Sequence, residues 1–147
     1  MALYAIADTH LSFTVEKPMD IFGGVWTNYI EKIRENWVAL IKPEDVVILA
    51  GDITWAMRLE EADADFEFLD QLPGQKIILK GNHDYWWSSV KKMQTRWPNF
   101  RFLYNNFQVY SDVAICGTRG WVCPGSNGFT AEDDAIYRRE LLRLENS

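Results

Sequence analysis

The stretch Ile77–Trp87, I-I-L-K-G-N-H-D-Y-W-W, indicates the fold class of this 147-residue chain. Its apolar run ends at Gly81, and Asn82, His83 and Asp84 follow without a spacer. A short apolar run is typical of a buried strand, and a glycine at its end permits a tight turn. Polar side chains at the carboxyl end of a strand lie where open α/β sheets bind ligands. Taken alone, the same residues are equally compatible with a polar turn that caps the next helix.

The same pattern occurs at two earlier places in the chain. Leu3–Ala7 is an apolar run followed by Asp8 and His10, and Val46–Ala50 is a β-branched run followed within two residues by Asp52. The chain contains only two histidines, and both fall in these polar clusters. Random placement would rarely give this arrangement. It therefore favours a metal or catalytic site over two unrelated core histidines.

The segments between these strands have helical periodicity. Residues 26–41 place apolar side chains three and four positions apart, and Pro43 follows them. Strands joined by crossover helices predict a parallel sheet with helices packed on it. Asn105-Asn106 and Ser111-Asp112 predict turns that join the last three strands into a hairpin-like segment after the βαβ part. Thr130 with Asp133 resembles a helix capping box. We expect strands at residues 1–7, 46–50, 76–80, 100–103, 107–110 and 113–116, and helices at about 26–41, 59–72, 88–96 and 130–145.

Composition limits the class of protein. A hydrophobic content of 48% over 147 residues predicts a single globular domain. The net charge of −6 argues against a general nucleic-acid surface, which needs a basic face. No signal peptide and no run of membrane-spanning length is visible. The two cysteines, Cys116 and Cys123, do not have a zinc-ribbon spacing, so we expect a reducing, cytoplasmic setting.

The polar clusters contain oxygen and imidazole ligands but no thiolate. Asp8, His10, Asp52 and Asn82 therefore suit a catalytic site for manganese, iron or zinc better than a structural zinc site. Asp52 belongs to the middle cluster, and its two oxygens are able to bridge two ions. Two ions about 3.5 to 4 Å apart clamp the attacking and leaving oxygens of a phosphoryl displacement and generate hydroxide near neutral pH.

His83 adjoins a candidate ligand and suits a different role. It is placed to protonate a leaving alkoxide or to contact a phosphate oxygen. Asp84 follows it directly, and we expect the Asp84 carboxylate to orient the His83 ring.

Three motifs carry a family resemblance: Asp8-x-His10, Gly51-Asp52 and Gly81–Asp84. Their order, spacing and position after strands resemble the first three motifs of the calcineurin-like metallophosphoesterase superfamily. The resemblance covers about residues 1–90. It implies an α/β fold with a metallophosphoesterase-like β-sandwich core flanked by helices. It also implies that Asp8 and His10 bind the first metal, Asp52 bridges both metals, Asn82 binds the second, and His83 is catalytic with support from Asp84.

A later segment resembles bacterial members of the family. Residues 115–121 are similar to a stretch that follows a central strand, which makes Arg119 a candidate phosphate contact. A surface arginine in the glycine-rich loop 117–129 is the competing interpretation. The chain also departs from the family pattern, because the family uses further histidines, including a G-H-x-H pair. No histidine follows His83, so residues 1–147 are part of a longer protein, or a partner supplies the missing ligands, or the site is degraded. Because the three motifs present are intact, we expect residues 1–147 to form only the N-terminal part of such a domain.

Two functions remain open at this point. The first is a divalent-metal-dependent phosphoesterase that hydrolyses a phosphate ester with metal-activated hydroxide at a dinuclear site. The second is a catalytically inactive phosphoesterase-fold module that serves protein interaction. A nucleotide-binding α/β protein is disfavoured, because no P-loop and no G-x-G-x-x-G motif follows the first strand. An exposed sheet edge would also favour self-association.

Overall fold

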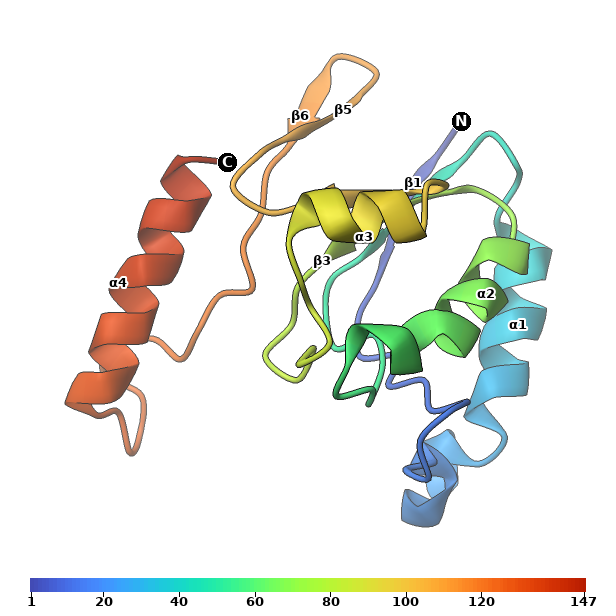
Figure 1. Cartoon of the computed structure of the whole chain (residues 1–147), viewed down its shortest axis with the longest axis horizontal. Coiled ribbons are helices and arrows are strands. Elements are labelled where there is room, and N and C mark those ends of the chain that lie inside the picture. Colours follow the sequence, from blue (N-terminus) through green and yellow to red (C-terminus); the bar gives the residue numbers. More distant parts are fainter.

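A four-stranded parallel sheet forms the centre of the computed structural model, which describes residues 1–147 (Figure 1). Its strands are neighbours in the order in which they occur along the chain. Because all four run in the same direction, the loops that follow them lie at one edge of the sheet. The strands are β1 (Leu3–Ile6), β2 (Val46–Leu49), β3 (Gln75–Leu79) and β4 (Phe100–Leu103).

Three helices connect the successive strands. They are α1 (Tyr29–Leu40), α2 (Asp63–Gln71) and α3 (Val90–Arg96). Parallel crossovers are almost always right-handed, so a sheet whose strands follow chain order has all its crossover helices on one face. Side chains from all three helices accordingly join one large hydrophobic core with the sheet.

Seven of the 19 buried residues in this larger core are aromatic, and several of them pack around Phe66. Phe66 of α2 is fully buried, and its ring stacks on Trp97 with 3.9 Å between the centroids. Trp86 and Phe100 pack edge-on against the same ring. Phe66 therefore joins α2 to β4 and to the segments on either side of α3.

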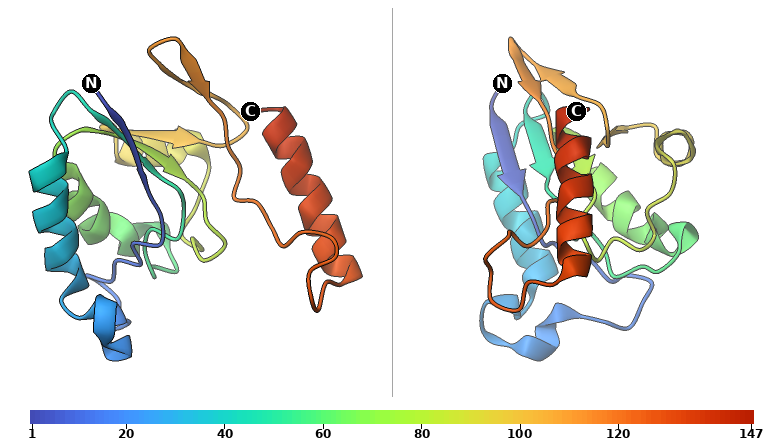
Figure 2. Two further views of the ribbon diagram at one scale, coloured as in Figure 1. Left: turned by 180° about the vertical axis from the view of Figure 1, so that it is seen from behind. Right: turned by 90° about the vertical axis from the view of Figure 1, so that its left-hand side faces the viewer.

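A smaller layer lies on the opposite face of the sheet. Here β5 (Gln108–Tyr110) and β6 (Val113–Ile115) form an antiparallel hairpin. Buried residues of β2, β3 and β4 form a second core with Ile115 of β6. Helix α4 (Ala131–Glu145) is on this side as well, away from α1 and α2 (Figures 1 and 2).

The expected elements are present, with shifted ends. Helix α1 begins at Tyr29, three residues later than expected, because Gly24–Trp26 forms a 3-10 turn. The segment Leu59–Ala62 is also 3-10, so the expected second helix is α-helical only from Asp63. The capping box between Thr130 and Asp133 is confirmed. Strand β4 belongs to the parallel sheet instead of the hairpin segment, because α3 is the crossover that places it beside β3.

None of the helices combines the length and the apolarity that crossing a membrane requires.

Replacement of Phe66 with alanine tests the larger core. We expect Phe66→Ala to lower the free energy of unfolding by about 3–5 kcal/mol, because it removes a fully buried ring and leaves a cavity. Leu142→Ala is the matched control: Leu142 is 60% exposed, so its change should stay within about 0.5 kcal/mol. Urea denaturation followed by circular dichroism measures both. Equal stabilities for the two variants would contradict this description of the core.

Candidate metal centre

The loops after β1 and β2 share an unusual backbone conformation. Asp8, His10 and Asp52 all have positive φ, at 57°, 42° and 51°. Non-glycine residues seldom adopt this region, and such strain concentrates at functional sites. The two loops are also hydrogen-bonded to each other, because Asp8 N donates to Gly51 O at 3.1 Å and His10 N donates to Asp52 O at 3.0 Å. The backbone thus holds these three side chains at one place.

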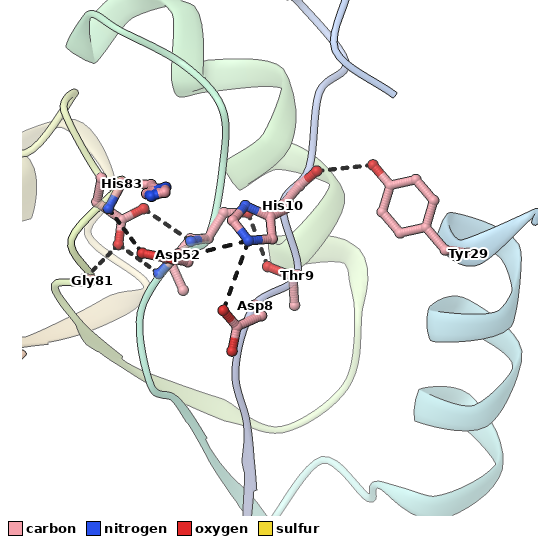
Figure 3. Close-up of polar contacts among 9 residues, drawn as sticks. Asp8, Thr9, His10, Tyr29, Asp52, Gly81 and His83 are labelled. Atoms are coloured by element: carbon pink, nitrogen blue, oxygen red, sulfur yellow. Dashed lines mark hydrogen bonds and ion pairs between the residues drawn. The ribbon is translucent and has the colours of Figure 1, made fainter. Parts of the chain in front are cut away.

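The side chains of Asp8, His10 and Asp52 converge at the carboxyl edge of the sheet (Figure 3). One potential ligand atom from each lies within 4.8 Å of the others. His10 Nε2 is 3.7 Å from Asp8 Oδ1 and 3.9 Å from Asp52 Oδ2. These distances are too long for direct hydrogen bonds. The arrangement leaves space between the donors, as a metal-binding site does.

Burial sets the charge state of His10. It lowers the pKa of the imidazole, although the carboxylates of Asp52 and Asp8 act in the opposite direction. The neutral form, which coordinates metal ions, is therefore favoured at neutral pH. Trp55 stacks on the ring with 4.4 Å between the centroids, and the Tyr29 hydroxyl donates to His10 O at 2.9 Å. These contacts hold the residue from two sides.

Asp84 connects the loops after β2 and β3. It is fully buried, and its Oδ2 accepts hydrogen bonds from Gly81 N at 2.7 Å and Asp52 N at 2.9 Å. Its Oδ1 accepts from Ile53 N and from the indole of Trp86, both at 2.9 Å. All four bonds come from groups other than the His83 ring. The expected orienting role of Asp84 is therefore corrected, because both oxygens are engaged in holding the loops together.

Gly81 is required by the close approach of Asp52. A Cβ at this position would lie 2.1 Å from Asp52 Oδ1 and 2.2 Å from Asp52 N. The next loop also holds this carboxylate, because His83 N donates to Asp52 Oδ1 at 2.9 Å. Asp52 thus has one oxygen directed at the third loop, while the other faces His10 (Figure 3).

The remaining predicted residues lie at different depths. Asn82 is exposed and lies between Gly81 and His83 in the third loop. The His83 ring is half-buried, 5.4 Å from the Trp55 ring and 6.1 Å from the His10 ring between centroids. Its Nδ1 is buried and has no hydrogen-bond partner. His83 thus belongs to the same side-chain cluster as His10.

Arg119 is engaged by α4. Its Nε lies 3.3 Å from Glu140 Oε1, and its guanidinium lies 4.7 Å from the centre of the Trp121 ring. Burial lowers the pKa of Lys80, and the positive charge of Arg119 adds to this effect. Arg119 therefore lies near the end of β3, but the structure pairs it with a carboxylate, and its role as a phosphate contact stays a prediction.

Three further residues shape the site and were not predicted from the motifs. Trp55 packs against His10, Thr9 donates its hydroxyl to Ile53 O at 2.9 Å, and Asp65 bonds to both metal-site loops. Thr9 and Trp55 lie within three residues of Asp8, His10 or Asp52. This closeness in sequence is only a weak indication that they belong to the site. Asp65 lies inside a run of acidic residues, a pattern typical of a solvated helix face, and the structure departs from this pattern at Asp65, which is fully buried.

The comparisons with known proteins agree with this geometry. The family model for the calcineurin-like phosphoesterases matches residues 1–145, and the chain belongs to that family. Membership indicates metal-dependent hydrolysis of phosphoesters.

Two individual proteins are similar to the chain. The uncharacterized protein MJ1445 of Methanocaldococcus jannaschii is 23% identical over 126 residues, which are 84% of this chain and 67% of that protein. The crystal structure of AQ665, a protein of unknown function from Aquifex aeolicus, matches with a TM-score of 0.56 and 22% identity. That match covers 95% of this chain and 72% of the other. At this identity the likeness shows the fold alone.

Gly81→Ala tests the packing of the centre. We expect affinity for Mn²⁺ to fall about 10–100-fold, as it does when groups around a metal ligand are displaced, because the new methyl group must move Asp52. Isothermal titration calorimetry measures the affinity. Gly120→Ala is the control, since no atom lies near the Cβ position of Gly120; its positive φ adds a backbone strain that Gly81 does not have, so this control is the more demanding one. Equal affinities in the two variants would contradict the proposed close approach.

Proposed function

We propose that the chain is a metal-dependent phosphoesterase that hydrolyses a phosphate ester at a dinuclear centre formed at the carboxyl edge of the parallel sheet. The observation that carries this proposal is the convergence of Asp8, His10 and Asp52, whose donor atoms lie within 4.8 Å of one another. The family to which the chain belongs supports the same activity.

The donor set fits a divalent cation. Two carboxylates and a neutral imidazole suit manganese, iron or zinc. The two carboxylates have no lysine or arginine within ion-pair distance, and their only ion-pair partner is His10. His10 Nδ1 is buried without a hydrogen-bond partner. A cation would offset the mutual repulsion of the carboxylates, which burial of Asp52 strengthens.

Each residue has a proposed place in the centre. Asp8 and His10 would hold one ion, Asp52 would bridge to the second, and Asn82 would bind the second ion with its amide oxygen. When bound, the ions supply Lewis acidity and lower the pKa of a water molecule. The hydrogen bond from His83 N keeps Asp52 facing this space.

His83 is proposed as the catalytic acid. Its ring lies within the cluster formed by His10 and Trp55, close enough to give a proton to the leaving oxygen of an ester bound there. Asp84 would contribute by fixing the backbone of the Gly81–Asp84 turn. The substrate is a phosphate ester, and Arg119 would approach its phosphate only after release from Glu140.

Asp52→Asn tests the proposed function. We expect Mn²⁺-dependent hydrolysis of bis(p-nitrophenyl) phosphate and p-nitrophenyl phosphate to fall at least about 100-fold, because the bridging charge is lost. The melting temperature should stay close to that of the wild type, since asparagine also accepts the bond from His83 N. Asp70→Asn is the control, because exposed Asp70 contacts Asn99 on the outer side of α2. Unchanged turnover in Asp52→Asn would overturn the bridging assignment.

A non-catalytic interaction module is the second candidate, and the free edge of β1 favours it. β1 is hydrogen-bonded on one side only, and Leu3 is 40% exposed. A largely apolar groove of about 430 Å³ lies between β1 and α1. Unpaired strand edges are templates for association, so we propose that copies of the chain associate through this edge.

We also propose a cytoplasmic setting. Both cysteines are free and exposed, which supports this proposal.

Leu3→Lys tests the proposed association. A lysine on an edge strand opposes pairing, so we expect the wild type to dimerise as its concentration rises and the variant to stay monomeric. Light scattering after size exclusion measures the mass. Val113→Lys is the control, because it places the same charge on an exposed strand residue of the other sheet. A wild-type protein that stays monomeric across the concentration series would contradict association through β1.

A further inference from the structure

Asp65 is a buried carboxylate that the proposed chemistry does not use. It lies on α2 and is fully buried, whereas acidic side chains are seldom buried without a specific partner. Burial raises its pKa, and the hydrogen bonds that it accepts act against this shift. The burial of the Asp65 carboxylate is unfavourable by itself, so its hydrogen-bond partners indicate which part of the structure it stabilises.

Its partners lie on two of the metal-site loops. Oδ1 accepts a hydrogen bond from Phe13 N at 2.9 Å, and Oδ2 accepts one from the Thr54 hydroxyl. Phe13 stands three residues after His10, and Thr54 stands two residues after Asp52. One carboxylate on a rigid helix is thus bonded to both loops that present the candidate ligands.

The two loops are also joined at the same point. Leu11 and Thr54 form an isolated parallel bridge, with Leu11 N donating to Ile53 O at 2.9 Å and Trp55 N donating to Leu11 O at 2.9 Å. The Thr54 hydroxyl accepts from Ala56 N at 3.0 Å. These bonds make a stiff connection between Asp65 and the backbone of His10 and Asp52. Displacement of the carboxylate would therefore shift one loop against the other.

We propose that Asp65 is a positioning residue of the metal centre, whose carboxylate sets the separation of His10 and Asp52 and thereby the affinity for a divalent cation. This inference rests on the metal site of the proposed function. Asp84 performs the corresponding task between the loops after β2 and β3. Two buried carboxylates thus hold three loops in register. Removal of groups that support metal ligands commonly weakens metal affinity about 10–100-fold.

Variants at Asp65 separate positioning from a purely structural role. Calorimetric titration with Mn²⁺ should show affinity about 10–100-fold lower in Asp65→Ala and less than about threefold lower in Asp65→Asn. Asparagine keeps the shape, an acceptor for Phe13 N and a polar contact to Thr54. Asp63→Ala is the control on the same helix, because Asp63 pairs with Arg96 and Trp97 away from the centre. It should lower the melting temperature without changing Mn²⁺ affinity.

A second pair of variants keeps the test decisive if Asp65→Ala does not fold. Thr54→Val removes the hydroxyl that bonds to Asp65, and Thr54→Ser retains it. We expect weakened Mn²⁺ binding only in Thr54→Val. Wild-type affinity in Asp65→Ala, or in a folded Thr54→Val, would overturn the positioning role while leaving the metal site intact. Absence of Mn²⁺ and Zn²⁺ binding by the wild type would overturn the proposed function and this inference together.

Discussion

Three backbone N–H groups and one indole N–H converge on the buried carboxylate of Asp84. Burial raises the pKa of this group, and the charge of Asp52 adds to the shift; an isolated buried carboxylate would also be costly. The four donors reduce that cost without reversing the shift, because hydrogen bonds to a carboxylate favour its charged form. These donors belong to the loop after β2 and the turn after β3. The same bonds that stabilise Asp84 therefore also fix the backbone position of Asp52.

The other features of the site depend on this connection. Gly81 approaches Asp52 so closely that no side chain fits between them, and His83 N bonds to the Asp52 carboxylate. The opposite side of Asp52 faces His10, whose own loop is bonded to the Asp52 backbone. Each loop is therefore positioned by its neighbour. The positive φ angles at the ligand positions can persist because so many contacts determine them.

The two faces of the sheet are covered to different degrees. Three helices and a dense aromatic core cover one face, whereas the other has a short hairpin and a core of four buried residues. Helix α4 is held on that side by polar contacts of the buried Glu140, which accepts a hydrogen bond from the Thr118 hydroxyl and lies 3.3 Å from Arg119 Nε. This carboxylate explains why Arg119 does not lie among the metal-site side chains.

Local sequence determined much of the fold and the position of the site. Short apolar strands, periodic helices and the three strand-end motifs were sufficient to predict the parallel sheet and to bring Asp8, His10 and Asp52 to one edge, because strand direction and side-chain periodicity are local properties. The tertiary structure alone decided the partners of Asp84, the burial of Asp65 and the pairing of Arg119 with Glu140. Asp65 and Asp84 bond to residues up to 52 positions away, and Arg119 is held by a helix beyond a long loop. A hydrogen-bonding side chain does not reveal its distant partner until the chain has folded, so these roles were not visible in the order of residues.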